Sequence, residues 1–452
     1  MASKLIAETP FLKELFSEIK EENYGYCILR DYQHLPLHTD GHDIDILVAP
    51  GLELVVLNFI SNIASRHNGV LISLYENETI IARFCGKDKT WWGVAIDLIP
   101  RLYYRTMVYY NEQHILKNIS KHCGIHVASQ QDGSMVSFLK ECLSNGRDRK
   151  NYATTAKNNY LQTPKYYKHL FTNTFGKAGS NYLDAFFSSN IDDNLVGELC
   201  KRLRKCLFFT NCKRNGTLST IFTRLTNYAN CLPRVISPPG FVVCVLGTDG
   251  SGKSSIINLI QPVLEKALHS KIEYRHMRPN LLPSIAKLLR NSDTTNSKIV
   301  INPHNSNPSG PIGSILRLTY YSIDYVFGYW LKVYPSLIKR PCLWIFDRYY
   351  YDYLIDPYRG RISLPRWVIK TFGLLIPKPD LTLCLGADPA VIHKRKPELP
   401  LPEVKRQVQE LKRFCQQTPK AIWIDTGCPI EKSVDQALEA ITSAMAARYR
   451  EK

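Results

Sequence analysis

One stretch of the chain, residues 241–257, constrains the fold more than any other. It reads FVVCVLGTDGSGKSSII and contains the spacing Gly-x-x-x-x-Gly-Lys-Ser, which runs from Gly247 to Ser254. The apolar run before Gly247 is typical of a buried parallel strand, and the apolar residues after Ser254 fit one face of a helix. A strand, a glycine-rich turn and a helix in this order predict a loop whose backbone N–H groups hold the phosphates of a nucleoside triphosphate.

The residues of this loop also predict how it would bind its ligand. Its glycines allow a tight turn, Lys253 supplies a mobile cation, and Ser254 offers a hydroxyl group to Mg²⁺. The candidate binding residues are Gly247, Gly250, Ser251, Gly252, Lys253, Ser254 and Ser255. A nucleoside triphosphate with Mg²⁺ is therefore the expected ligand of this part of the chain.

The length of the chain, 452 residues, is too great for one compact core and predicts two or three domains. Residues 230–240 contain three prolines and a glycine, which predict a turn-rich linker just before the loop and its strand. The expected fold class is multidomain α/β. We expect an N-terminal α+β domain over residues 1–105, a helical extension over residues 106–236, and a domain with a parallel sheet flanked by helices over residues 237–452.

Several features of the sequence indicate a cytoplasmic protein without a membrane span. The first residues carry charges where a secretory signal would be continuously apolar. The most apolar stretch, residues 312–338, is interrupted by Arg317, Asp324 and Lys332, so a largely buried helix is expected there. Thirteen cysteines, an odd number without any Cys-x-x-Cys pair, favour reduced thiols over disulfides or a zinc site. These features leave the oligomeric state open.

The chain carries a net charge of +18, from 58 basic and 40 acidic residues. The excess is strongest over residues 201–290, which hold 15 basic and 3 acidic side chains. Such a field can attract a nucleic-acid backbone, or it can hold a triphosphate together with an anionic acceptor. Because the basic residues include the loop lysine and lack regularly interleaved aromatic residues, we favour small anions over nucleic acid.

A second candidate site lies near the N-terminus, where Asp43 and Asp45 alternate with isoleucines. This period of two predicts a strand that carries both carboxylates on one face. A second apolar strand, residues 92–99, carries Asp97. Three converging carboxylates repel one another, and divalent metal ions are their natural neutraliser, so Asp43, Asp45 and Asp97 are candidate metal ligands.

The run GHDIDILV at residues 41–48, with Asp97 on a later strand, resembles the minimal nucleotidyltransferase fold of polymerase beta-like enzymes. The resemblance covers roughly residues 20–105 and implies that the three aspartates hold the metal ions of nucleotidyl transfer. The chain departs from the usual pattern upstream, where residues 29–32 read LRDY in place of a Gly-Ser pair. Residues 106–236 lack a chemical motif and read as helices that cover this domain.

Residues after the glycine-rich loop predict further parts of the same site. Arg275 and Arg278 lie in a short predicted strand that ends just before Pro279. Their planar donor groups suit the phosphate of an acceptor. The apolar run at residues 343–346 ends in Asp347, a position from which a carboxylate would order Mg²⁺ beside the loop. Arg348 follows at the carboxyl edge of the sheet, where ligands of open α/β sheets bind.

Two further strands are expected at residues 381–385 and 421–425, and a surface insertion at residues 291–313. Between the strands, the basic stretch at residues 389–399 predicts a lid over the phosphates. Its charge donors would be Lys394, Arg395 and Lys396. A solvated basic turn without a ligand is the alternative.

The loop sequence GTDGSGKS, the triplet DRY at residues 347–349 and the basic lid together resemble thymidylate kinase and related nucleoside monophosphate kinases, over roughly residues 238–448. The resemblance implies that Lys253 and Ser254 bind ATP and Mg²⁺. It further implies that Arg275 or Arg278 holds the acceptor, that Asp347 and Arg348 hold the metal ion and phosphates, that Arg395 contacts the transferred phosphoryl group, and that Asp249 approaches the acceptor.

Residues 275–279 read RHMRP in place of the Arg-Glu-Pro-Gly segment of true thymidylate kinases, and residues 352–359 are foreign to the housekeeping enzyme. Thymidylate itself is therefore not the favoured acceptor. We expect a kinase that transfers the γ-phosphoryl group of ATP to a nucleotide, a sugar or a sugar phosphate, coupled to a nucleotidyltransferase-like domain. Two alternatives stay open: a nucleic-acid-associated protein that modifies an end, and a nucleotide-sensing regulator with a degenerate first domain.

Overall fold

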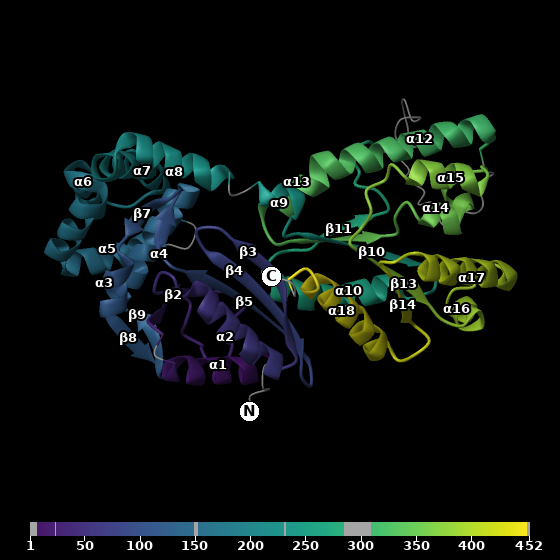
Figure 1. The fold of residues 1–452 in the computed structure, drawn as a ribbon, viewed down its shortest axis with the longest axis horizontal. Coiled ribbons are helices and arrows are strands. Elements are labelled where there is room, and N and C mark those ends of the chain that lie inside the picture. Colours follow the sequence, from purple (N-terminus) through teal and green to yellow (C-terminus); the bar gives the residue numbers. More distant parts are fainter. Residues whose placement is uncertain (1–6, 23, 149–151, 230–231, 284–308, 450–452) are drawn as a thin grey trace. The chain divides into compact units, whose positions relative to one another are not determined.

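The computed structural model describes residues 7–22, 24–148, 152–229, 232–283 and 309–449 of the chain. They belong to two compact units, Met1–Ile236 and Ser237–Lys452, each with its own sheet and its own hydrophobic core (Figure 1). The chain is of mixed α/β class, as expected. Within the described residues, no helix combines the length and the apolar character needed to cross a lipid bilayer.

The first unit is built on a mixed seven-stranded sheet with the order β3-β4-β5-β2-β1-β9-β8 (Figure 1). Its strands are β1 (Tyr26–Ile28), β2 (Ile44–Val48), β3 (Gly69–Glu76), β4 (Ile80–Lys87), β5 (Trp91–Ile99), β8 (Ile119–His122) and β9 (Ile125–Ala128). β2 and β5 run parallel, and their register sets Asp45 directly opposite Asp97. Two of the three candidate metal ligands are therefore neighbours in the sheet.

Residues 107–128 do not follow the helical prediction for residues 106–236. They contain β7 (Met107–Tyr110), which pairs with β6 (Leu102–Tyr104), then the short helix α3 (Glu112–Lys117), and then β8 and β9. β9 pairs in parallel with β1 and buries Ile125 and Val127 in the core. The strands after residue 105 have four residues each, so their alternation does not stand out in the sequence, and distant strands supply their pairing.

Helices cover both faces of this sheet. They are α1 (Thr9–Glu21), α2 (Glu53–Arg66), α4 (Gln130–Asn145), α5 (Tyr152–Gln162), α6 (Pro164–Ser188), α7 (Asp193–Asn215), α8 (Thr217–Ala229) and α9 (Pro233–Ile236). α1 and α2 share a core with Ile46 and Phe84, whereas α4 to α7 share another with Leu29 and Leu47. Because Asp45 projects from β2 on the same side as Leu47, it faces the second core and its helix α4.

The second unit holds a five-stranded sheet with the order β11-β12-β10-β13-β14, in which every pairing is parallel. Its strands are β10 (Phe241–Gly247), β11 (Glu273–His276), β12 (Leu343–Asp347), β13 (Leu381–Gly386) and β14 (Ala421–Asp425). All the strands predicted for this unit are present. Since parallel strands share one carboxyl edge, the loop after β10 and the residues after β12 meet there.

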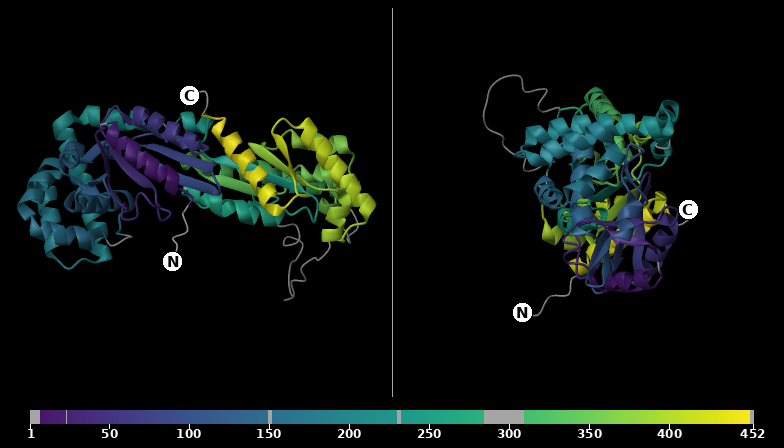
Figure 2. Two further views of the ribbon diagram at one scale, coloured as in Figure 1. Left: turned by 90° about the horizontal axis from the view of Figure 1, so that it is seen from below. Right: turned by 90° about the vertical axis from the view of Figure 1, so that its left-hand side faces the viewer.

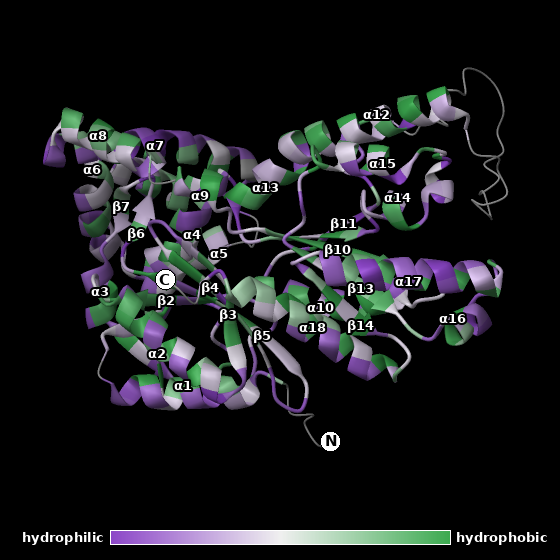
Figure 3. Ribbon diagram, turned by 45° about the vertical axis from the view of Figure 1, so that its right-hand side comes forward, coloured by the Kyte–Doolittle hydropathy of each residue, from purple (hydrophilic) through white to green (hydrophobic). Residues whose placement is uncertain are grey.

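The helices of this unit also form two layers. They are α10 (Lys253–Leu268), α12 (Pro311–Gly328), α13 (Tyr334–Lys339), α14 (Asp352–Ile355), α15 (Arg366–Gly373), α16 (Pro389–Arg395), α17 (Leu401–Gln417) and α18 (Ile430–Ala446). α12 and α17 share a core with Cys244 and Phe346, whereas α10 and α18 lie side by side on the other face (Figures 1 and 2). Figure 3 shows hydrophobic strands beside helices with long hydrophilic stretches, such as α17.

The expectation of a largely buried helix at residues 312–338 is wrong in part. α12 continues into a π-helical turn (Tyr329–Val333) and then α13, and it buries Leu318 and Tyr325 but leaves Leu316 66% exposed. The helix therefore packs through one face, since a helix on the surface of a sheet buries only a stripe. The surface insertion predicted at residues 291–313 lies outside the described residues as far as residue 308.

Candidate active site

The loop between β10 and α10 adopts the turn that its glycines predict. Gly250 and Gly252 have φ angles of +83° and +85°, in the left-handed region that residues with a Cβ atom rarely adopt. The loop surrounds the ammonium group of Lys253, which donates hydrogen bonds to the carbonyl oxygens of Gly247 (2.9 Å) and Thr248 (3.0 Å). The lysine is thus held by the carbonyl groups of its own loop.

Lys253 is buried, and its burial has an electrostatic consequence. Burial and the neighbouring Arg348 cation lower the pKa of Lys253 from its usual range to about 7, against the opposing effect of Asp249 and Asp347. An anion placed against the loop would favour the charged amine and raise this pKa again. Lys253 is therefore poised to take up a proton when a phosphate group arrives.

Asp347 lies at the carboxyl end of β12, opposite Val245 of β10. Its Oδ2 accepts a hydrogen bond from the Tyr274 hydroxyl (2.9 Å), and His276 Nδ1 lies 3.6 Å from the same oxygen. Burial alone would raise the pKa of Asp347, but hydrogen bonding to His276 and the charge of Lys253 lower it below its usual value. The carboxylate is therefore ionised at neutral pH.

Three buried oxygen atoms near the loop have no hydrogen-bond partner among the described residues: Thr248 Oγ1, Ser251 Oγ and Asp347 Oδ1. Buried polar atoms without a partner are rare in folded proteins and are unfavourable. Hydroxyl groups and an ionised carboxylate oxygen are what phosphate groups and a hydrated Mg²⁺ ion require. The loop residues and Asp347 therefore fit a nucleoside triphosphate with Mg²⁺.

Two arginines tie the acidic residue of the loop to the chain that follows β12. Asp249 accepts a hydrogen bond from Arg348 at 2.7 Å and pairs with Arg359. Arg348 is 3% exposed and also donates to both carboxylate oxygens of Asp352, at 2.9 and 3.0 Å. Arg359 Nε lies 3.4 Å from an oxygen of Asp356. Arg348 and Arg359 thus form one ion-pair network with three carboxylates.

This network decides the charge of Asp249. Burial would raise the pKa of Asp249, but Arg348 and Arg359 lower it well below its usual range. The structure therefore places Arg348 between Asp249 and Asp352, where the resemblance had implied an arginine that holds phosphates. Asp249 is ionised and fixed in place.

Arg359 was not singled out as a site residue from the sequence, although residues 352–359 were recognised as unusual. The signal was the spacing of Asp352, Asp356 and Arg359, four residues and then three, which places side chains on one side of a helical turn. α14 and the 3₁₀ turn Pro357–Gly360 provide those turns. Tyr274 and His276 were also missed, because their role depends on the register of β11 against β12.

The predicted lid begins beside the loop. A Cβ atom on Gly250 would lie 2.9 Å from the carbonyl oxygen of Ile392 and 3.0 Å from the Cβ atom of Lys396, so the end of α16 approaches the loop closely. Lys394 and Arg395 are exposed at that end. The structure therefore brings the backbone of the basic stretch to the loop, and it leaves the charged side chains of Lys394 and Arg395 accessible to solvent.

Arg275 is one of the two candidate acceptor arginines. Its side chain lies on the opposite face of the sheet from the side chain of Asp347. It pairs in register with Phe346, whereas His276 pairs with Asp347. Since neighbouring residues of a strand point to opposite faces, Arg275 projects away from the side that carries Asp347. Its guanidinium group lies 5.2 Å from the Trp344 ring.

Arg278, the other candidate, is held among aromatic rings. It forms a 2.9 Å ion pair with Asp324 of α12, which is fully buried. Its guanidinium group lies 4.9 Å from the Tyr321 ring, which stacks on Tyr353 with ring centroids 5.6 Å apart. Arg278 is therefore anchored through Asp324 and lies outside the ion-pair network around Asp249.

In the first unit, the structure brings the three predicted metal ligands together. One oxygen atom from each of Asp43, Asp45 and Asp97 lies within 4.8 Å of the others. The neighbouring cations are Arg30 and Lys140, which pair with Asp45, and Arg83, which donates to Asp97 at 2.9 Å. Protein side chains thus supply three positive charges around the carboxylates.

The carboxylates differ in how well these cations compensate them. Burial would raise the pKa of Asp45, but Lys140 and Arg30 lower it overall. Burial raises the pKa of Asp97, and Arg83 offsets this only in part while Asp45 adds to it. A cavity of about 80 Å³ beside Asp45 is lined by Arg30, Lys140 and Arg101 among others, a lining that suits an anionic group.

Comparison with known proteins finds similarity over part of the chain. No protein-family model matches it. Over 153 residues, 34% of this chain and 68% of the relative, it is 26% identical to a "Probable thymidylate kinase" of Pyrobaculum aerophilum. Among solved structures, thymidylate kinase from Ehrlichia chaffeensis aligns with a TM-score of 0.32 and 15% identity, covering 45% of this chain and 98% of that one. Part of the chain is therefore similar in sequence to a protein named as a thymidylate kinase.

The ion-pair network gives a first testable prediction. Replacing Arg359 by methionine removes one of the two arginine partners of Asp249, so we expect the free energy of unfolding at pH 7 to fall by about 2 kcal/mol. Arg413→Met is the matched control, because Arg413 pairs with Glu410 at the surface, where a loss below about 0.5 kcal/mol is expected. Urea unfolding of both variants measures the difference.

The loss of stability expected for Arg359→Met should depend on pH. The folded-state pKa of Asp249 is lowered well below its usual range, so the stabilisation that its charge brings is fully present above the unfolded-state pKa of an aspartate, about 3.9, and is lost as the pH falls through the lower folded-state pKa. The gap between the wild type and Arg359→Met should therefore persist from pH 7 to about pH 4 and shrink only when unfolding is repeated at lower pH, toward about pH 2. A gap that disappears above about pH 4 would contradict the assignment, because Asp249 is ionised there in both states.

Proposed function

We propose that the second unit is an ATP-dependent phosphotransferase of the nucleotide kinase class. The observation that carries this proposal is the loop itself: the buried Lys253 feels the charge of the ionised Asp347, and Thr248 and Ser251 of the loop, like Asp347, each have a buried oxygen without a hydrogen-bond partner among the described residues. The sequence similarity to the Pyrobaculum aerophilum protein named as a probable thymidylate kinase supports the same class. A motor or a nucleic-acid enzyme has no comparable support.

In this proposal the loop holds the phosphates of ATP. The backbone N–H groups of residues 248–253 and the Lys253 ammonium group bind the phosphate oxygens, and the carbonyl groups of Gly247 and Thr248 release the lysine in exchange. Ser254 and Asp347 would hold Mg²⁺, which would supply positive charge to offset the negative charge of the phosphates. Lys394 and Arg395 neutralise the same charge when the lid stretch closes over it.

We assign recognition of the acceptor to Asp249 and Arg278. Asp249 is fixed by Arg348 and Arg359, so it can orient an acceptor hydroxyl without moving. Arg278 offers a cation, and the half-buried Tyr321 beside it offers part of an aromatic ring. A phosphate-bearing acceptor with a planar or sugar group fits this combination, and we propose a nucleotide, a sugar phosphate or a sugar as the class. Arg275 has no part in it.

We further propose that the first unit transfers nucleotidyl groups. The observation in favour is the convergence of Asp43, Asp45 and Asp97, together with a cavity beside Asp45 whose lining includes Arg30, Arg101 and Lys140. The three aspartates would hold divalent ions, as two-metal sites for this chemistry require. Arg30 and Lys140, now paired with Asp45, would turn to the phosphates of the incoming triphosphate. The two units would then act in succession on one small molecule.

The kinase proposal predicts that Lys253→Met lowers phosphoryl transfer from ATP about 100-fold or more, since one preorganised cation is removed from the developing charge. Lys271→Met, at an exposed lysine of the same unit, should leave the rate unchanged. The assay measures ATP-dependent phosphorylation of a panel of nucleotides, sugars and sugar phosphates. Retention of full transfer activity by Lys253→Met would exclude this loop as the site.

Proton uptake tests the same loop without any acceptor. At pH 8 a lysine with a pKa of about 7 is mostly neutral, whereas a lysine bound to phosphate is charged, so binding of ATP with Mg²⁺ should take up close to one proton. Calorimetric titration in two buffers of different ionisation enthalpy measures this number. We expect it to disappear in Lys253→Met. An equal uptake by both proteins would show that another group titrates.

The nucleotidyl-transfer proposal predicts that Asp43→Asn abolishes metal-dependent incorporation of labelled nucleotide from a triphosphate while phosphoryl transfer from ATP stays intact. Asp43 is half-buried, so the substitution disturbs the fold less than one at the buried Asp45 would. Asp88→Asn, at an exposed aspartate of the same unit, is the control. Loss of both activities together would argue against two separate sites.

A further inference from the structure

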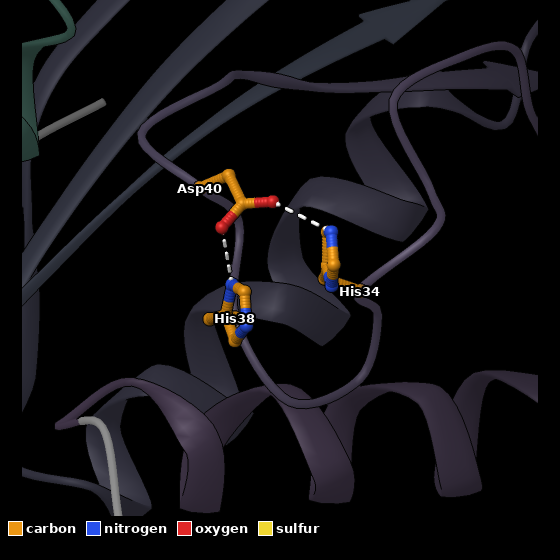
Figure 4. A group of neighbouring side chains, drawn as sticks. All are labelled: His34, His38 and Asp40. Carbon is orange, nitrogen blue, oxygen red and sulfur yellow. Dashed lines mark ion pairs between the residues drawn. The ribbon is translucent and has the colours of Figure 1, made fainter.

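Two histidines and an aspartate gather in the loop between β1 and β2, apart from the three carboxylates of the candidate site (Figure 4). The backbone N–H of His38 donates to the carbonyl of His34 at 3.2 Å, which places the two histidines one helical turn apart. Their rings stack with centroids 4.8 Å apart and an interplanar angle of 15°. Both side chains therefore present ring nitrogens on the same side of the turn.

Asp40 is the third member of this group and contacts both histidines. One of its oxygens lies 3.2 Å from His34 Nε2, and the other lies 2.7 Å from His38 Nδ1 (Figure 4). The three ligand atoms all lie within 4.8 Å of one another. Two ligands of a tetrahedral zinc ion, each at roughly 2.0–2.1 Å from the metal, are about 3.3 Å apart. The spacing in the loop is thus close to that of a metal site.

We propose that His34, His38 and Asp40 bind a divalent transition-metal ion of the zinc type. Two imidazole nitrogens and one carboxylate oxygen are a donor set that suits such ions and does not suit Mg²⁺ or Ca²⁺, which prefer oxygen ligands throughout. The side chains of His34 and Asp40 are 59% and 44% exposed. Water therefore has access to the remaining coordination positions.

Ion pairing alone is a poorer account of this arrangement. One carboxylate carries one negative charge, and two stacked imidazolium rings would repel each other across 4.8 Å. A divalent ion uses both rings in their neutral form and balances the carboxylate at the same time. A shared ion therefore uses the stacked, same-side presentation of the two rings without bringing two positive charges together.

The ion would have a local structural effect that is independent of the proposed activities. The loop that carries the three ligands spans residues 29–43; it contains Arg30, the partner of Asp45, and ends at Asp43. The loop is joined to α1 by the hydrogen bond from the Thr9 hydroxyl to the carbonyl of Leu37, at 2.6 Å, and by Leu35, which packs into the same core as α1. A metal ion held by the loop would add a further restraint, and its nitrogen ligands would distinguish it from an ion held by the three carboxylates.

The experiment is calorimetric titration of the full-length chain with Zn²⁺ in metal-free, reducing buffer, repeated with Co²⁺ and optical absorption. The wild type should bind one equivalent of Zn²⁺ that His34→Ala and His38→Ala each weaken by about 10-fold or more. Asp40→Asn keeps the shape of the side chain, and asparagine tolerates the φ angle of +52° at this position, so its fold should survive while affinity falls. His169→Ala, at an exposed histidine of α6, is the matched control and should bind as the wild type does.

The Co²⁺ spectrum separates this site from the cysteines of the chain. Coordination by nitrogen and oxygen gives weak visible bands, whereas thiolate ligands add intense charge-transfer absorption, and only the first result supports the proposal. Circular dichroism and thermal unfolding of each variant establish that it is folded. The proposal is overturned if Zn²⁺ binds the wild type no more tightly than the folded Asp40→Asn protein, or if the bound Co²⁺ has thiolate ligands.

Discussion

The structure of the candidate kinase site depends on the charge balance around Asp249. Four carboxylates, from Asp249, Asp347, Asp352 and Asp356, share a small region at the edge of the sheet with Arg348, Arg359 and Lys253. Together, the two arginines form ion pairs with Asp249, Asp352 and Asp356. Lys253 therefore turns to backbone carbonyl groups, and its burial with a lowered pKa follows from that. A bound phosphate group would give this lysine an anionic partner in place of the carbonyl groups.

The three carboxylates of the first unit also depend on neighbouring cations, but there the cations pair directly with the carboxylates. Here Arg30, Arg83 and Lys140 pair directly with Asp45 and Asp97, so under the proposed function these cations would have to change partners on binding of a metal ion and a triphosphate. A divalent ion would also offset the burial and the Asp45 charge that raise the pKa of Asp97.

The parts of the fold that could be predicted from the sequence are those in which neighbours along the chain are neighbours in space. The strand, loop and helix around Lys253 and the strand that ends at Asp347 are of this kind, and both are present. Arg275 is a residue for which prediction from the sequence fails. The alternation of β11 could be read from the sequence, but which face Arg275 shares with β12 is fixed by register, and it pairs with Phe346. The short strand β9 and the pairing of Arg359 with Asp249 could not be predicted because these partners come from distant parts of the chain, although the spacing of Arg359 from Asp352 and Asp356 was visible in the sequence.

The group of His34, His38 and Asp40 could not be predicted from the sequence for a different reason. A spacing of four residues between histidines indicates a metal site when the chain is helical, and nothing in a stretch that contains Pro36 predicts a helical turn. The turn exists because the backbone N–H groups of Leu37 and His38 both donate to the carbonyl of His34. A single loop thus carries nitrogen ligands at its middle and ends at an oxygen ligand, Asp43. Since the two donor sets select different ions, one loop can hold a zinc-type ion beside a site for Mg²⁺ without competition between them.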